Sequence, residues 1–200
     1  ITIEHTAPES KALAAAFFIT GGTTGFGGYF FNNRITSNVT PVWIAGKYGG
    51  TINTRIENNV IVKSANAPAD YVPFRMGSAG CEDCVAKNVI LRSNTVVNDS
   101  FSIRVEGKGH SYKIFRKLRI VLTDRQKNPL ARADIAVFDA YGTLVSTLQT
   151  DIDGSISADL LQTEVSGELK KSYSPYTLSV GKTKVNVPLN KDTTISLVVK

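Results

Sequence analysis

The sequence predicts an all-β protein in two parts, a short solenoid of parallel coils followed by an antiparallel β-sandwich. An asparagine pattern repeats through the first half, alternating strands fill the second half, and helical runs of 3.6-residue periodicity do not occur. The 200 residues include 16 glycines and 7 prolines, a turn-rich composition that suits short strands. The pattern changes near Tyr112, which predicts domains at residues 1–112 and 113–200.

The repeat of the first half is built around asparagine. Segments 30–35, 56–61 and 91–96 share an apolar residue, two intervening positions, an asparagine and a β-prone pair. Their asparagines, Asn33, Asn59 and Asn94, are 26 and 35 residues apart, and this period predicts three to four coils. We expect these asparagines to stack at one turn of successive coils as a structural ladder. A sugar-contacting role is the alternative.

A second strand precedes each repeat segment, and one more follows the last. These strands are 18–21, 43–46, 74–77 and 103–106, and a glycine ends the first three. Aligning them on glycine points Phe18, Trp43, Phe74 and Ile103 inward, so that Trp43 lies directly over Phe74. Because side chains alternate along a strand, Ile19, Ile44, Arg75 and Arg104 then point outward.

The Asn-Asn-x-Ile and Ser-Asn-Thr-Val-Val-Asn segments resemble the coils of right-handed parallel β-helix proteins of the pectate-lyase-like superfamily. The resemblance covers residues 12–110 and carries no catalytic signature of that superfamily. Such proteins include polysaccharide-active enzymes as well as phage and surface adhesins. The resemblance implies a short right-handed parallel β-helix. Because solenoid ends need covering, we expect either further coils before Ile1 or a partner on that face.

The second half reads as about seven strands joined by turns. They are 115–122, 133–138, 144–148, 156–160, 176–180, 184–189 and 194–199. Leu118, Ile120 and Leu122 alternate onto one face of the first of them. Segments 121–124, 128–133, 137–139 and 150–154 are similar to carboxypeptidase-regulatory-like and transthyretin-like domains. That similarity implies a seven-stranded antiparallel β-sandwich, usually an accessory module.

The two cysteines form the sequence Cys81-Glu82-Asp83-Cys84. A disulfide in an oxidising compartment is one interpretation, and a pair of free thiols is another. A zinc site would need two further ligands, for which His5 and His110 are the available histidines. A thioredoxin-like redox role would need a βαβ context, which the sequence lacks.

The candidate binding residues are basic. The net charge is +6 and the basic residues are spread along the chain, which favours acidic polysaccharides or cell-surface glycans over nucleic acid. Arg75 and Arg104 would lie one coil apart on the outward face, with Lys47, Lys108 and His110 at neighbouring turns. This row predicts a site for an anionic glycan. A solvated face without a ligand and a lyase active site are the alternatives.

No cofactor or metal is expected, with calcium as the alternative. Residues 151–154 resemble the start of a calcium loop, but Gln162 stands where that loop requires glutamate. The longest apolar run, residues 12–19, is too short to span a bilayer, which needs about 20 residues.

The sequence thus predicts an extracellular or cell-surface module that is noncatalytic and carbohydrate-binding, adhesive or structural. One alternative is the C-terminal part of a polysaccharide lyase or glycoside hydrolase that acts on acidic glycans. Another is a subunit of a self-assembling extracellular filament or appendage, which associates through its open β-helix end.

Overall fold

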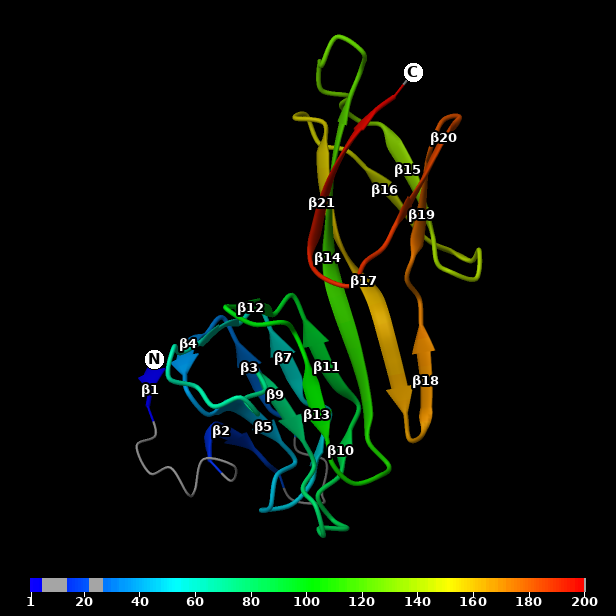
Figure 1. Cartoon of the computed structure of the whole chain (residues 1–200). Coiled ribbons are helices and arrows are strands. Elements are labelled where there is room, and N and C mark those ends of the chain that lie inside the picture. Colours follow the sequence, from blue (N-terminus) through cyan, green and yellow to red (C-terminus); the bar gives the residue numbers. More distant parts are fainter. Residues whose placement is uncertain (5–13, 22–26, 200) are drawn as a thin grey trace. The chain divides into compact units, whose positions relative to one another are not determined.

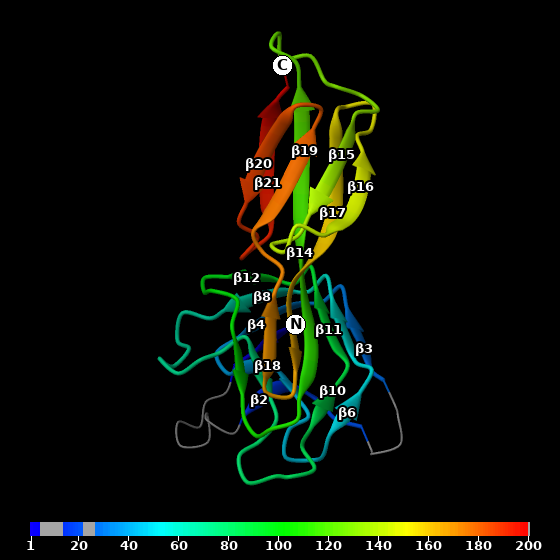
Figure 2. The same cartoon turned by 90° about the vertical axis from the view of Figure 1, so that its right-hand side faces the viewer.

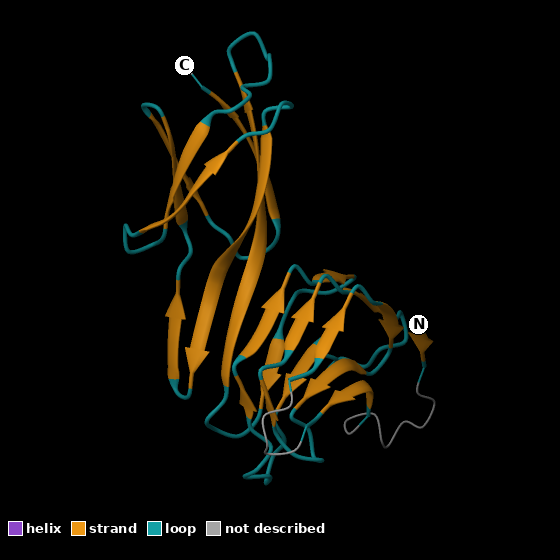
Figure 3. Ribbon diagram, turned by 180° about the vertical axis from the view of Figure 1, so that it is seen from behind, coloured by secondary structure: helices purple, strands orange, loops and turns teal. Residues whose placement is uncertain are grey.

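The computed structural model describes residues 1–4, 14–21 and 27–199, and these are all-β with no helix (Figures 1 and 3). The prediction of an all-β protein is therefore confirmed for this part of the chain. The chain forms two compact units, one of residues 1–113 and 165–170, the other of residues 114–164 and 171–200. The predicted boundary after residue 112 lies beside the first crossing between the units, although residues 165–170 return to the first unit.

The first unit consists of short parallel strands in three rows, which are clear in Figure 3. One row contains β1 (Thr2–Ile3), β4 (Arg34–Ser37), β8 (Val60–Lys63) and β12 (Thr95–Val97). The second row contains β2 (Ala15–Ile19), β5 (Thr40–Ile44), β9 (Phe74–Met76) and β13 (Ile103–Val105). The third row contains β3 (Tyr29–Phe31), β7 (Arg55–Glu57) and β11 (Val89–Arg92). The short strands β6 (Thr51–Ile52) and β10 (Ala86–Lys87) pair beside it.

The chain visits the three rows in the same order on each circuit. Each strand therefore pairs in parallel with the strand one circuit later, for example β4 with β8 and β8 with β12. Apolar residues in register form continuous interior columns. One column contains Phe30, Ile56 and Leu91, and another contains Ile35, Ile61 and Val96. Burial of these columns contributes to the apolar stabilisation of the unit.

The predicted alignment of the second row is correct between β2 and β5 and between β9 and β13, but it is wrong by one residue between β5 and β9. Strand β5 pairs with β9 so that Val42 faces Phe74, and Trp43 faces Arg75 instead of Phe74. Phe18 does face Trp43. The column on the outward face therefore contains Phe18, Trp43, Arg75 and Arg104, so the inward placement of Phe18 and Trp43 was incorrect. Ile19 and Ile44 belong to the opposite face together with Met76.

The cause of the error is a left-handed residue that is not glycine. The amide of Ala45 donates to Ile19 O, and the amide of Gly77 donates to Ile44 O, so these two residues occupy equivalent positions. Ala45 has φ +51° there and Gly77 has φ +77°. Because glycine is the usual left-handed residue, an alignment on glycine paired Gly46 with Gly77 and shifted the register.

The second unit holds longer strands, some of which begin or end in the first unit. They are β14 (Ser111–Thr123), β15 (Asp134–Phe138), β16 (Leu144–Gln149), β17 (Ser155–Ser166), β18 (Leu169–Ser172), β19 (Tyr176–Val180), β20 (Thr183–Val187) and β21 (Thr193–Val198). Strands β16, β15, β19 and β20 form an antiparallel sheet in that order (Figure 2). Strand β14 neighbours β17 and β21. The pair β14 and β21 is parallel, which departs from the predicted antiparallel arrangement, and β18 was not predicted.

One apolar core holds the second unit together. Leu118, Ile120 and Leu122 of β14 are fully buried in it, on the single face that their alternation predicts. Ile135 and Leu178 from the antiparallel sheet pack in the same cluster. Lys117 and Arg119 alternate with the apolar residues along β14. They are consequently directed to the opposite face of the strand, where they are exposed.

Candidate functional site: the predicted basic row and a groove in the second unit

Arg75, the centre of the predicted basic row, is held by neighbours in the first unit. It is in register with Arg104 on the adjacent strand. Its guanidinium carbon lies 3.8 Å from the centroid of the Trp43 ring, and one of its nitrogens is 2.8 Å from each carboxylate oxygen of Glu106. Only 9% of Arg75 is exposed. Its charge is therefore neutralised inside the protein, which makes it a weak candidate for a glycan contact.

The other cations of the row have separate local partners. Arg104 donates to Asp70 O at 2.9 Å. The Lys47 amine lies 5.1 Å from the centroid of the Tyr48 ring. The Lys108 amine lies 3.8 Å from a carboxylate oxygen of Glu168, and both side chains are largely exposed. A glycan-binding role for these three residues stays a prediction.

The His110 side chain is held in the first unit by hydrogen bonds to backbone groups. It is buried, its Nδ1 accepts from the amide of Ala86 at 3.1 Å, and its Nε2 lies 2.9 Å from Glu106 O. Because a carbonyl oxygen only accepts, Nε2 carries the proton, and the ring is in one neutral tautomer. The imidazole thus links neighbouring turns, and both of its nitrogens are engaged.

The structure joins Cys81 to Cys84 by a disulfide, with the two Cα atoms 5.4 Å apart. The bond closes a turn whose second cysteine is buried. Among the described residues, no group of three His, Cys, Asp or Glu side chains is placed to hold a metal ion. His5, which the sequence offered as a zinc ligand, lies outside the described residues.

The side chains of the three repeat asparagines stack in a hydrogen-bonded ladder in the first unit. The side-chain amide of Asn33 donates to Asn59 Oδ1 at 3.0 Å, and that of Asn59 donates to Asn94 Oδ1 at 2.9 Å. The backbone amides of Asn33 and Asn59 donate to the same two oxygens. Asn59 and Asn94 are buried, so their polar groups satisfy one another and the turn backbone.

The residue before each ladder asparagine has a left-handed backbone conformation, which explains why asparagine recurs at that position. Asn32, Asn58 and Ser93 have φ angles of +55°, +56° and +50°. Asparagine adopts this left-handed conformation more readily than most residues. An Asn-Asn pair therefore supplies both the bend and the ladder group, and Ser93 takes the bend position in the last pair.

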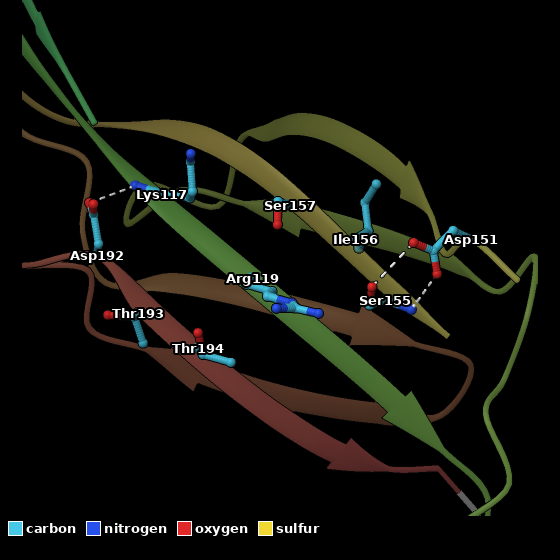
Figure 4. Close-up of a pocket in the computed structure, with 9 residues that line it drawn as sticks. All are labelled: Lys117, Arg119, Asp151, Ser155, Ile156, Ser157, Asp192, Thr193 and Thr194. Carbon is cyan, nitrogen blue, oxygen red and sulfur yellow. Dashed lines mark hydrogen bonds between the residues drawn. The ribbon is translucent and has the colours of Figure 1, made fainter. Parts of the chain in front are cut away.

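A groove in the second unit is a site that sequence reasoning missed (Figure 4). Its volume is about 570 Å³. The lining residues are Lys117, Arg119, Asp151, Ser155, Ile156, Ser157, Asp192, Thr193 and Thr194. They come from β14, from β17, from the start of β21 and from the adjoining turns.

Strand alternation places the polar groups of the groove. Lys117 and Arg119 are two residues apart on β14, so both lie on the face opposite the core. Thr194 of β21 is in register with Arg119. Ser157 of β17 is exposed, whereas the preceding Ile156 packs against the core cluster. The groove therefore combines two cations with a row of hydroxyl groups.

The two acidic residues of the groove are already engaged. Asp151 Oδ1 accepts from the amides of Ser155 at 2.8 Å and Asp153 at 3.1 Å. The hydrogen bond from the Ser155 amide is the main cause that lowers the Asp151 pKa, and the charge of Arg119 contributes to the same shift. Asp192 Oδ1 accepts from the backbone amide of Lys117 at 2.9 Å.

The two cations of the groove remain available. Within the described part of the chain, neither Lys117 nor Arg119 forms an ion pair within 4 Å. The signal for this site was the Lys-Leu-Arg-Ile alternation at residues 117–120. The sequence did not show that hydroxyl-bearing residues of two other strands would lie beside these cations.

Comparisons of the chain with protein-family models, with curated proteins and with solved structures find no match. The two family resemblances therefore rest on residue patterns alone. In the segments that the structure describes, no helix is long and apolar enough to cross a membrane.

Proposed function

We propose that this protein is an extracellular, noncatalytic module that binds acidic polysaccharide in the groove of the second unit. The observation that carries the proposal is the pair Lys117 and Arg119, which is without an ion-pair partner in the described residues and lies among serine and threonine hydroxyls. The proposed partner remains an acidic glycan, but the site moves from the Arg75 row to this groove.

The chemistry of the groove suits a chain of uronic acid units. A guanidinium binds a carboxylate through two parallel hydrogen bonds, and a lysine amine attracts a second carboxylate as a point charge. The two side chains are two residues apart, or about 7 Å along the strand. Ser157 and Thr194 supply hydroxyl groups that exchange hydrogen bonds with sugar hydroxyls. Because these residues lie on paired strands, the cations start from well-defined positions.

The proposal includes the finer fold and the location. We propose that the first unit is a right-handed parallel β-helix of the pectate-lyase-like kind with three to four coils, which the repeated parallel register supports. We propose that the second unit is a sandwich of the carboxypeptidase-regulatory-like kind, which its shared apolar core supports. The disulfide at Cys81 supports an oxidising, extracellular location.

The test compares retention on immobilised polygalacturonate. The variant with Lys117→Ala and Arg119→Ala should bind about tenfold more weakly, because it loses two charge-assisted contacts. The matched control is Lys182→Ala with Lys184→Ala, which removes the same charge from exposed residues of the same unit. The loss in the groove variant should shrink as salt rises. Equal retention of the two double variants would contradict the proposal.

The same material tests the enzymatic alternative. A polysaccharide lyase leaves an unsaturated uronate, which absorbs in the ultraviolet. Incubation of the full chain with polygalacturonate, with and without added calcium, should give no new absorbance if the module is noncatalytic. A steady rise in absorbance that requires the protein would favour the lyase.

Self-association is a second candidate function that one observation favours. Within the described residues, β1, β2 and β3 each lie at the end of a row and are paired on one side only. Such strand edges are templates for pairing with another chain. Sedimentation velocity over a range of protein concentrations tests this candidate, which predicts a sedimentation coefficient that rises with concentration.

A further inference from the structure

Two exposed aromatic rings lie side by side on the outward face of the first unit. Tyr29 and Phe31 are 56% and 47% exposed, and their ring centroids are 4.6 Å apart. Strand alternation explains the placement, since the intervening Phe30 packs against Phe17 at a centroid distance of 5.2 Å. Large apolar rings that remain together in solvent commonly mark a binding surface.

A carboxylate lies beside these rings. Glu57 of β7 is in register with Phe31 of β3, and only 6% of it is exposed. Its Oε2 accepts from the Tyr29 hydroxyl at 2.8 Å, and this hydrogen bond is the main cause that raises the pKa of Tyr29. Its Oε1 has no hydrogen-bond partner among the described residues.

The unpaired oxygen requires an explanation. A buried acceptor without a donor is costly, and such groups are rare in folded proteins. A donor that arrives with a ligand would remove this cost. Arg55 of β7 and Arg92 of β11 act electrostatically on Tyr29, so the cluster also lies near positive charge.

We propose that Tyr29, Phe31 and Glu57 form a binding site for a neutral hexose unit of a polysaccharide. The apolar face of a pyranose ring packs against an aromatic ring, and its hydroxyls donate to a carboxylate. A neutral hexose supplies the hydroxyl donors that the carboxylate lacks without placing a second anion beside it. The site lies in a different unit from the groove and does not rest on the groove being a binding site.

The hydroxyl of Tyr29 has a defined role in this site. It occupies Glu57 Oε2 in the ligand-free protein. A sugar with two neighbouring hydroxyls donates to both carboxylate oxygens and displaces the tyrosine hydroxyl, while the aromatic ring remains to contact the sugar. The ring of Tyr29 is therefore required for binding, whereas its hydroxyl competes with the ligand.

Calorimetric titration of the full chain with cellohexaose, mannohexaose and xylohexaose tests the proposal, with xylohexaose as the pentose comparison. Binding of at least one of the two hexose oligomers is expected. Tyr29→Ala, Phe31→Ala and Glu57→Gln should each weaken that binding about tenfold. Tyr29→Phe should bind as tightly as the unchanged protein or more tightly, because it keeps the ring and frees the carboxylate. The control is Tyr141→Ala, which removes an equally exposed ring from the second unit and should leave binding unchanged.

Three results would overturn the inference. They are failure of both hexose oligomers to bind, an equal loss in the Tyr141→Ala control, and a Tyr29→Phe variant as weak as Tyr29→Ala. Unfolding curves of each variant by circular dichroism show whether the first unit is still folded. Lys117→Ala with Arg119→Ala should leave hexose-oligomer binding unchanged, so a failed groove and a failed aromatic site give different results.

Discussion

Among the described residues, the first unit buries more polar side chains than the second. In the first unit, polar residues such as Asn59, Asn94 and His110 are at most 3% exposed and hydrogen-bond to turns of neighbouring coils. In the second unit, a single apolar cluster draws residues from strands far apart in the sequence. Turn carboxylates such as Asp124 and Asp151 remain at its surface.

The difference follows from how the chain returns to each sheet. Successive circuits of the chain in the first unit place one turn over the next, so turn backbone becomes buried and needs polar side chains as partners. Strands joined at the surface leave most of their turns in water, so the interior of the second unit is mainly apolar, and its buried polar residues among those described are Arg116, Asp139, Thr150 and Thr163. Substitution of a buried polar residue in the first unit should therefore cost nearly as much as substitution of a buried apolar one, whereas substitution of an exposed turn residue in the second unit should cost little.

The largest expected effect is that of Trp43→Ala in the first unit. Trp43 is fully buried, its ring centroid lies 5.1 Å from that of Phe18, and its Nε1 donates to Gly77 O at 2.6 Å. Its loss also removes the ring beneath the Arg75 guanidinium. We expect the free energy of unfolding to fall by about 4 kcal/mol.

Chemical denaturation followed by far-ultraviolet circular dichroism measures this effect. The matched variant Trp43→Phe keeps an aromatic ring but leaves Gly77 O without its donor. It should lower the free energy of unfolding by about 1 kcal/mol. A similar cost for the two variants would mean that the column of Phe18, Trp43 and Arg75 is not a packed unit.

The next effect compares two positions of the asparagine ladder. Asn59 is fully buried and hydrogen-bonds to Asn33, Asn94 and Phe30 O, whereas Asn33 is half-buried at the end of the described ladder. Asn59→Ala should lower the free energy of unfolding by about 3 kcal/mol, because it leaves several buried groups unpaired. Asn33→Ala should lower it by about 1 kcal/mol.

Denaturant titrations of both asparagine variants give the comparison directly. Equal costs at the two positions would show that burial within the ladder does not matter. A cost for Asn59→Ala slightly below that of Trp43→Ala is expected. A negligible cost for Asn59→Ala would contradict the view that buried polar groups stabilise the first unit.

The predictable parts of the fold are those where local pattern and stacking agree. The spacing of the asparagines leads to their ladder because stacked coils repeat the same turn, and the alternation of Leu118, Ile120 and Leu122 leads to one buried face. The register of Trp43 could not be read correctly because Ala45 takes a conformation usually left to glycine. Nothing in the local sequence indicates that exception.

The candidate sites were less predictable than the fold. The pairing of Arg75 with Glu106 depends on the register of two adjacent strands, so a residue that looked like a free cation is neutralised. The groove depends on three strands whose order the sequence does not specify. In particular, β21 pairs in parallel with β14 although the two strands lie about 75 residues apart in the sequence. The Glu57 cluster likewise depends on register, which sets the carboxylate beside Tyr29 and Phe31.

The smallest expected effect concerns a turn carboxylate of the second unit, and it depends on pH. The Asp151 pKa is lowered from its ordinary value of 3.8, chiefly by the hydrogen bond from the Ser155 amide. A carboxylate whose pKa is lower in the folded state stabilises the fold above the unfolded value and loses that contribution as pH falls through the folded value. Asp151→Asn should therefore lower the stability slightly at neutral pH, where the ionised carboxylate contributes, and should flatten part of the decline in stability below pH 3.8.

Denaturant midpoints measured from neutral pH into acid test this expectation. The control is Asp153→Asn, which removes the same charge from the same turn without touching the hydrogen bonds that Asp151 accepts from the amides of Ser155 and Asp153. The acid decline of Asp151→Asn should be flatter than that of this control. A neutral-pH loss for Asp151→Asn as large as that of Asn59→Ala would place turns of the second unit under the same constraint as those of the first. The contrast between the two units would then no longer hold, because solvent would not be supplying the partners that the surface turns need.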